Sequence, residues 1–229
     1  MPRKKKQLIR DPLKSERAWT PDVSLSDISS LPVLPSKFHV SNVRFVHLSY
    51  HSQVYLVDFV HEGEQLSAIL KVFSKDNEQR YQDEVNAYRL LNHYDVPSRG
   101  VVPKLYGILP NITEKKLHTL LGVAQPNESQ ITFPASAILI EYIEGAEMPT
   151  KHNMTVQMAE EILRGLRLIH NAHVLHYDTE PRNILITPAT GKAVWIDFSN
   201  AEMAASWWEL IMERDLVREL VYRDLVLPT

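Results

Sequence analysis

Cysteine is absent from this chain of 229 residues, and its absence excludes two structural classes. Without thiols the protein cannot be a disulfide-stapled scaffold, and it cannot ligate zinc through thiolates. A composition without cysteine also fits a reducing compartment. The fold must therefore rest on a packed core, and a hydrophobic content of 44% is ordinary for a globular protein that has one.

Long apolar runs and a large excess of one charge are also missing. No run approaches the length of a membrane span, so we expect none. The 25 basic and 28 acidic residues leave a net charge of −3, so nucleic acid is not an expected partner. The basic segment Met1–Lys6 lacks the apolar core of a secretion signal. These absences together point to a cytoplasmic or nuclear protein.

Residues 1–36 are predicted to form a flexible, mostly extended tail, because they are polar and contain several prolines. The basic run Arg3–Lys6 within them is interpreted as solvated charge, and the alternatives are a nuclear address or contact with an anionic surface. Residues 37–229 are predicted to form one α+β domain.

The hydrophobic pattern of this domain predicts strands separated by helices. Strands are expected at residues 43–48, 54–60, 66–73, 136–142, 184–187 and 193–196. Helices are expected at residues 79–94, 155–171 and 202–226, with Thr155 as a helix N-cap. Residues 110–134 are expected to form an irregular insertion that contains a short helix at 115–121.

Three polar residues near two loops carry the strongest signal for chemistry. Asp178 and Asn183 are five residues apart, and Asp197 follows at the end of the next predicted hairpin. An aspartate in this setting can accept a proton from an attacking hydroxyl, while Asn183 and Asp197 can hold Mg²⁺ against the phosphates of ATP. The alternative is a polar loop between two strands. Three such side chains converging on one point favour phosphoryl transfer.

Lys71 and Glu84 each interrupt an apolar pattern. Lys71 lies in an otherwise apolar strand, and Glu84 lies on the apolar face of the next predicted helix. A carboxylate on a core-facing stripe needs a cationic partner, so we expect the two residues to form an ion pair. The alternative for Lys71 is a side chain at the strand edge that extends to water.

Two parts of the chain resemble the two lobes of the protein-kinase-like superfamily. Ala68–Phe73 resembles the strand that carries the phosphate-binding lysine. His176–Asn183 and Asp197–Ser199 resemble the catalytic and metal-binding loops, with His176 in a structural role. The sequence Ile140–Gly145, together with the residues around Asp178, is most similar to aminoglycoside and choline phosphotransferases and to small fungal kinase-like proteins.

This resemblance, over roughly residues 40–200, implies a two-lobed α+β fold. Residues 37–143 would form a small antiparallel β lobe with one helix, and residues 144–229 a truncated, mainly helical large lobe. The resemblance implies that Asp178, Lys71 and Glu84 are catalytic and that Asn183 and Asp197 bind the metal. The residues expected at the nucleotide are Lys71, Val54, Ala68, Ile140, Glu141, Tyr142 and Ile143, the last three largely through their backbone.

Three features depart from the usual kinase pattern. Ser49–Gln53 stands where a glycine-rich loop normally covers ATP, yet it contains none of the seven glycines of the chain. Glu180 reverses the charge of the lysine that protein kinases place there. Tyr177 replaces the arginine of regulated kinases, and the short stretch after Ser199 leaves too little chain for the usual peptide-binding platform.

The sequence therefore predicts a Mg-ATP-dependent phosphotransferase that transfers the γ-phosphoryl group to a hydroxyl of a small-molecule or protein acceptor, which the motifs do not specify. The main alternative is a pseudokinase, a nucleotide-binding or protein-binding scaffold, which the glycine-free loop and Glu180 favour. A third reading is a fragment of a larger kinase. A protein partner would bind through the N-terminal tail or through residues 110–134.

Overall fold

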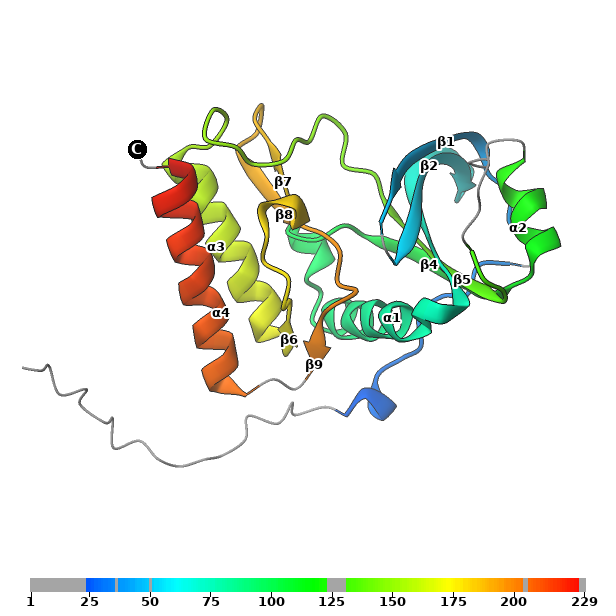
Figure 1. Cartoon of the computed structure of the whole chain (residues 1–229), viewed down its shortest axis with the longest axis horizontal. Helices are drawn as coiled ribbons and strands as arrows, with labels where there is room; N and C mark the ends of the chain where they lie inside the picture. The colour runs from blue at the N-terminus through cyan, green and yellow to red at the C-terminus, as the bar shows by residue number, and fades with distance from the viewer. Residues whose placement is uncertain (1–23, 36, 50, 123–130, 204–205, 227–229) are drawn as a thin grey trace, which may run out of the picture.

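A five-stranded antiparallel sheet forms one part of the molecule (Figure 1). The computed structural model describes residues 24–35, 37–49, 51–122, 131–203 and 206–226. The strand order is β1-β2-β3-β5-β4. These strands are β1 (Ser41–Leu48), β2 (Ser52–His61), β3 (Glu64–Phe73), β4 (Leu105–Ile112) and β5 (Ala135–Glu141). The expected strands in this region are confirmed, with most ends shifted by one or two residues.

Helices and two pairs of short antiparallel strands complete the α+β fold. The helices are α1 (Glu78–His93), α2 (Glu114–Leu121), α3 (Val156–Asn171), α4 (Trp207–Glu219) and the π-helix η5 (Leu220–Val226). Short 3₁₀ turns are η1 (Leu25–Asp27), η2 (Lys75–Asn77), η3 (Pro97–Arg99) and η4 (Pro181–Asn183). The paired short strands are β6 (Val174–Leu175) with β9 (Glu202–Met203), and β7 (Ile184–Thr187) with β8 (Lys192–Trp195).

The two faces of the sheet pack against different helices, because successive side chains of a strand point to opposite faces. On one face, Tyr55, Leu70 and Leu139 pack with Leu117 of α2 in one hydrophobic cluster. On the other face, Phe73 of β3 and Ile138 and Ile140 of β5 pack with α1 in a second cluster. The second cluster continues into α3 and the β7–β8 pair, so α1 joins the sheet to the helical part of the molecule.

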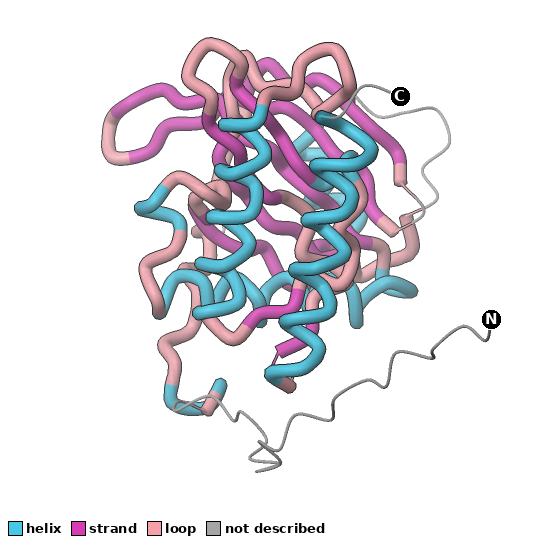
Figure 2. The backbone as a smooth tube through the Cα atoms, turned by 90° about the vertical axis from the view of Figure 1, so that its left-hand side faces the viewer, coloured by secondary structure: helices cyan, strands magenta, loops and turns pink. Residues whose placement is uncertain are grey.

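The helix α3 carries an apolar stripe of Met158, Ile162, Leu166 and Ile169, all buried. Thr155 caps it by accepting a hydrogen bond from the backbone N–H of Met158, which confirms the predicted N-cap. Trp195 of β8 is fully buried against this helix and donates its indole N–H to the Ile162 carbonyl at 3.0 Å. In Figure 2, α3 and α4 lie side by side in front of the strands.

The C-terminal part of the fold differs from the single helix predicted for residues 202–226. Glu202 and Met203 form β9, and α4 begins only after Ser206, which forms a capping box with Glu209. Trp207, the first residue of α4, is 61% exposed. The capping box fixes where the helix starts.

The predicted tail also differs, in the part of it that the structure describes. Residues 24–35 pack on the domain: Ile28 and Leu31 are buried in the same cluster as α1. Arg89 of α1 donates hydrogen bonds to the carbonyls of Leu25 and Ile28, and Val33 forms a parallel bridge to Ile108 of β4. In the sequence, the surrounding prolines and polar residues obscured three apolar side chains, Leu25, Ile28 and Leu31, which pack in or against the cluster that contains α1.

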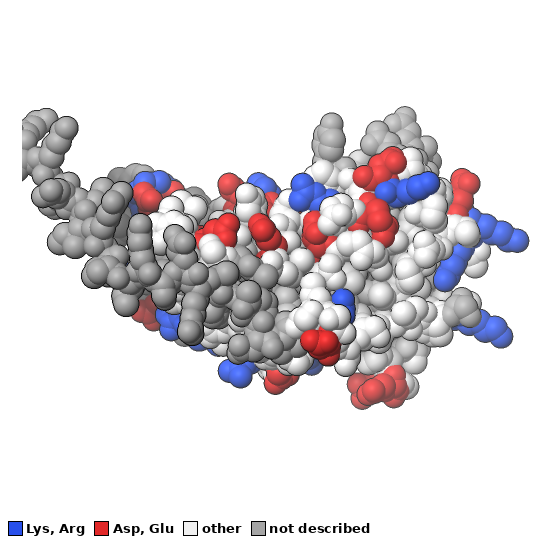
Figure 3. Space-filling model, turned by 90° about the horizontal axis from the view of Figure 1, so that it is seen from below, with Lys and Arg blue, Asp and Glu red and all other residues white. Residues whose placement is uncertain are grey.

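The described residues include no helix that is long and apolar enough to cross a membrane. On the face of the molecule seen in Figure 3, acidic and basic side chains are interspersed, and neither sign forms a continuous field. Such mixing is typical of a solvated surface.

Candidate functional site

Lys71 is the centre of a buried group of charged side chains. It lies on β3, and its Nζ is 2.7 Å from Glu84 Oε2 and 2.7 Å from Asp197 Oδ1. The Lys71 side chain is 7% exposed and that of Glu84 is fully buried. The ion pair expected between Lys71 and Glu84 is thereby confirmed. Asp197, from the other part of the molecule, shares the same ammonium group.

Burial and charge together set the ionisation of these three groups. Burial raises the pKa of Glu84 from 4.5 to about 7, although the Lys71 ammonium acts in the opposite direction. Burial alone would lower the pKa of Lys71, but Glu84 and Asp197 together raise it. Burial would raise the pKa of Asp197, but Lys71 and Ser199 hold it below its ordinary value. Lys71 and Asp197 are therefore charged at neutral pH.

Asp197 occupies a strained backbone position that aims its carboxylate at Lys71. Its φ of 63° lies in the left-handed region, which residues with a Cβ rarely adopt. The hydroxyl of Ser199 donates to Asp197 Oδ1 at 2.6 Å. Arg80 of α1 donates to the Asn200 side chain and, at 3.4 Å, to the Ser199 carbonyl. The loop after β8 is thus tied to the helix that carries Glu84.

Asp178 and Asn183 form a second group on the loop between β6 and β7. The Asn183 side-chain amide donates to the Asp178 carbonyl at 2.9 Å and is buried. The Asn183 carbonyl accepts from the backbone N–H of Ile196 at 2.9 Å. Because Ile196 precedes Asp197, this bond links the two groups across the base of the hairpin. The structure thus joins all five of the polar residues singled out from the sequence into one connected assembly.

The Asp178 carboxylate is held by Arg182. One guanidinium nitrogen of Arg182 lies 3.0 Å from each of the two carboxylate oxygens. Arg182 is 61% exposed at its side chain, so the pair lies at the surface of the site. Glu180, which reverses the usual charge, is exposed. The cation next to Asp178 therefore comes from residue 182 rather than from residue 180.

Glu213 of α4 is a residue that sequence reasoning missed. Its carboxylate is buried and accepts three hydrogen bonds: from the His170 ring at 2.6 Å, from the His176 backbone N–H at 3.2 Å and from the Tyr177 backbone N–H at 2.5 Å. Tyr177 has a φ of 69°, so this carboxylate holds a strained residue immediately before Asp178. The available signal was a glutamate flanked by Leu210 and Val217 on the apolar side of the helix.

His176 has the structural role expected of it. Its ring is fully buried between Trp195 and Phe198, and Nε2 donates to the Ile196 carbonyl at 3.0 Å. Burial lowers its pKa, so the ring is neutral. His170, in the last turn of α3, contacts Glu213 through its ring.

The residues predicted to cover a nucleotide divide between the two faces of the sheet. Val54 lies directly opposite Lys71 on β2, and Ile140 follows the same face of β5, so both share the face of Lys71. Ala68 does not: it is fully buried in the α2-side cluster with Leu70. Neighbouring residues of a strand point to opposite faces of the sheet. Ile69, two residues before Lys71, therefore lies on the face where Ala68 was expected, and the spacing from Lys71 would have identified it.

Glu141, Tyr142 and Ile143 follow directly at the end of β5. The Glu141 backbone N–H donates to the Lys104 carbonyl at 2.8 Å, so it is already engaged. Tyr142 is 36% exposed and Ile143 is partly buried. This segment connects the sheet to the chain that leads to α3.

The turn between β1 and β2 is closed on itself. The Ser49 hydroxyl accepts hydrogen bonds from the backbone N–H groups of His51 and Ser52 at 3.2 and 2.9 Å. The His51 ring lies 3.1 Å from the Asn77 side-chain oxygen. Tyr50 lies outside the described residues. Two amides that a glycine-rich loop would present to a phosphate are therefore occupied by a side chain of the same turn.

Oxygen atoms suited to a hard cation remain available next to these groups. Asn183 uses its side-chain nitrogen for the Asp178 carbonyl, and Asp197 uses Oδ1 for Lys71 and Ser199. This leaves Asn183 Oδ1 and Asp197 Oδ2 as potential ligands. The described residues contain no cluster of three or more His, Cys, Asp or Glu side chains that could hold a metal by themselves. Magnesium commonly needs only one or two protein ligands when phosphates supply the rest, so these two oxygens fit it.

Comparison with known proteins finds kinases. No family model matches the chain. A glycogen synthase kinase-3 homolog of Saccharomyces cerevisiae is 40% identical over 68 residues, which make up 29% of this chain and 18% of that protein. The striated muscle preferentially expressed protein kinase of Danio rerio is 27% identical over 117 residues, or 48% of this chain and 4% of that protein.

The aligned regions thus span less than a fifth of either relative. Both matches support a place for the chain in the protein-kinase-like superfamily. The likeness to aminoglycoside and choline phosphotransferases stays a prediction.

Proposed function

We propose that this protein is a Mg-ATP-dependent phosphotransferase with two lobes, residues 37–143 and 144–229, that meet at Lys71. The observation that carries the proposal is the buried ammonium of Lys71, held at 2.7 Å by one carboxylate from α1 and another from the loop after β8. Burying the Lys71 ammonium beside Glu84 is costly unless these groups serve each other or a ligand. A phosphate-binding lysine with a positioning glutamate is such a use.

Each residue of this chain would then have a separate task. Lys71, positioned by Glu84, would bind the α- and β-phosphates, and it must exchange its contact with Asp197 for the nucleotide. Asp178 would orient the acceptor hydroxyl and accept its proton. Arg182, which pairs with Asp178, would face the transferred group in place of the missing lysine. Transfer of this kind depends mainly on positioning and charge stabilisation.

Asn183 and Asp197 would hold magnesium through their free side-chain oxygens. When bound, the ion would neutralise the negative charge of the phosphates. Val54 and Ile69, which are partly exposed, and Ile140, which is buried, would contact the adenine ring, and the backbone of residues 141–143 would contact its edge. The acceptor would be a hydroxyl of a small molecule, as in aminoglycoside and choline phosphotransferases, or of a protein.

A second candidate function is a pseudokinase scaffold. The closed turn at Ser49 favours it, because that turn withholds two backbone amides from the phosphates. The Asp178 carboxylate paired with Arg182 is also less free to accept a proton. Such a scaffold would bind nucleotide weakly or would bind it without turnover.

Two substitutions separate these functions. Asp178→Asn should abolish most ATP turnover and leave nucleotide affinity nearly unchanged, because Asp178 acts on the acceptor. Asp197→Asn should weaken Mg-ATP binding first, because it removes a charged ligand. Mg-ATP at a hundred times its Kd should add about 2.7 kcal/mol of stability to the wild type, which a thermal melt detects, and EDTA should remove most of that gain.

The matched control is Asp215→Asn, an exposed aspartate of α4 outside the site. It should melt and bind as the wild type does. Wild-type turnover that survives Asp178→Asn would refute the catalytic assignment. Binding without turnover on any acceptor would leave the scaffold function, and no stabilisation by millimolar Mg-ATP would reject nucleotide binding itself.

A further inference from the structure

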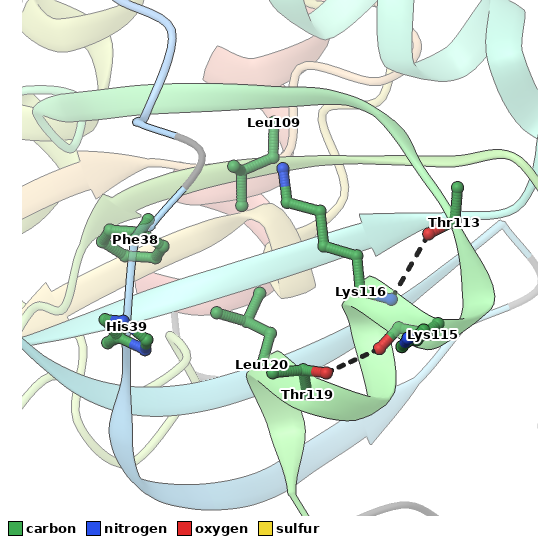
Figure 4. Close-up of a pocket in the computed structure, with 8 residues that line it drawn as sticks. All are labelled: Phe38, His39, Leu109, Thr113, Lys115, Lys116, Thr119 and Leu120. Carbon is green, nitrogen blue, oxygen red and sulfur yellow. Dashed lines mark hydrogen bonds between the residues drawn. The ribbon is translucent and has the colours of Figure 1, made fainter.

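A cavity of about 290 Å³ lies between α2, β4 and the segment that precedes β1 (Figure 4). It is on the α2 side of the sheet, whereas Lys71 projects toward α1. None of the residues that line it belongs to the assembly around Lys71. The cavity is therefore a separate feature of the molecule that phosphoryl transfer does not use.

The interior of this cavity is apolar. Phe38, Leu109 and Leu120 face the same space in Figure 4, from three different elements of the chain. Leu109 and Leu120 are held in the α2-side cluster, and Phe38 packs against Phe59 with ring centroids 6.0 Å apart. These walls are thus part of the rigid packing of the sheet. They offer a ligand hydrocarbon contact rather than hydrogen bonds.

The rim of the cavity is cationic. Lys115 and Lys116 both line it, and neither forms an ion pair among the described residues. No acidic residue lines it. The one acid of α2, Glu114, is 3.6 Å from His118, a residue that does not line the cavity. In Figure 4 the Lys116 side chain extends from α2 toward Leu109, and both residues line the cavity.

The helix uses part of the hydrogen-bonding capacity of the rim hydroxyls. Thr113 caps α2 by accepting a hydrogen bond from the Lys116 backbone N–H at 3.3 Å, and Thr119 donates to the Lys115 carbonyl at 2.8 Å. The donors left for a ligand are the two lysine ammonium groups, the Thr113 O–H and the ring of His39. This combination selects for negative charge rather than for a neutral polar group.

We propose that this cavity binds a small amphipathic anion, an aliphatic monocarboxylate of the fatty-acid type. Its hydrocarbon chain would lie against Phe38, Leu109 and Leu120, and its carboxylate would contact Lys115 and Lys116. The volume is at the lower end of the range for ligand pockets, about 300–1,000 Å³, so a chain of medium length fills it. A bare phosphate would leave the apolar wall uncovered, and a neutral alkane would leave two cations unpaired.

Octanoate is the probe for calorimetric titration of the full chain. It should bind with one molecule per protein, and affinity should rise about fourfold for each methylene from butanoate upward until the cavity is full. Octanol and octylammonium, which match its chain but lack the negative charge, should bind at least about tenfold more weakly. Equal binding of all three would overturn the proposal, as would no binding of octanoate at millimolar concentration.

Two variants test the residues independently. The double change Lys115→Gln and Lys116→Gln should weaken octanoate about tenfold and leave octanol unchanged. Thr119→Phe, at an exposed position on the rim, should fill the cavity and abolish binding of both, while Thr119→Ser should bind as the wild type does. Lys75→Gln and Lys104→Gln are the charge-matched controls, since neither residue lines the cavity. Octanoate binding that survives both tests would place the ligand elsewhere and refute the assignment.

Discussion

Replacing Lys71 with methionine should make folding stability depend strongly on pH above neutrality. The change keeps the apolar length of the side chain and removes the ammonium that lies 2.7 Å from Glu84. Glu84 is fully buried, so its carboxylate then has no cation to offset the loss of hydration. The group can escape this cost only by staying protonated, which becomes harder as pH rises.

The size of the effect follows from proton linkage. In the wild type the pKa of Glu84 is about 7 against an ordinary value of 4.5, so ionisation of this group lowers the free energy of unfolding as pH rises from 4.5 to 7. Most of that loss is complete at pH 7, and a further rise to pH 8.5 should lower the free energy of unfolding by only about 0.4 kcal/mol. In Lys71→Met the pKa of Glu84 rises further, so the step from pH 7 to pH 8.5 should lower the free energy of unfolding by about 2 kcal/mol.

Urea unfolding at pH 7 and pH 8.5, followed by tryptophan fluorescence, measures the difference. The double variant Lys71→Met with Glu84→Gln should lose the extra pH dependence, because no carboxyl remains to titrate. Lys75→Met, at an exposed lysine, should follow the wild type. If Lys71→Met and the wild type fall in parallel between the two pH values, the buried ion pair does not control Glu84 and the reasoning is wrong.

Two further changes test how the site is held in place. Glu213→Gln should cost about 1–3 kcal/mol and speed hydrogen exchange at the Tyr177 amide, because an amide nitrogen must then face one of three donors; unchanged exchange would show that the carboxylate does not hold this loop. Gly165→Ala should lower stability in urea unfolding by about 1–2 kcal/mol, even though alanine favours helices, because its Cβ would lie 3.1 Å from Trp195. An alanine variant as stable as the wild type would mean that the tryptophan shifts without cost.

The sequence was most informative where periodicity and charge coincide. Lys71 and Glu84 each broke an apolar pattern, and a charge in such a place needs a partner, so their contact could be predicted without a structure. The antiparallel strands and α3 followed from alternation and from the cap at Thr155. These signals are local, and the native packing agrees with them.

What could not be predicted depends on contacts between distant segments. The assignment of Ala68 to the nucleotide site was wrong because Ala68 lies three residues from Lys71 on the same strand. An odd separation places its side chain on the opposite face of the sheet. Glu213 acts through backbone groups about 37 residues earlier in the chain, and only the fold brings them together. The closed turn at Ser49 could not be foreseen, because a serine in a turn has several possible backbone partners.

The segment that runs from Ile28 to Val33 acts as a strap between α1 and β4. At one end Arg89 of the helix donates a hydrogen bond to the Ile28 carbonyl, and at the other end Val33 is bridged to Ile108. Because α1 carries Glu84, the strap holds the helix that positions Lys71 against β4. The placement of Glu84 therefore rests on residues 28–33 as well as on the packing of α1 against the sheet.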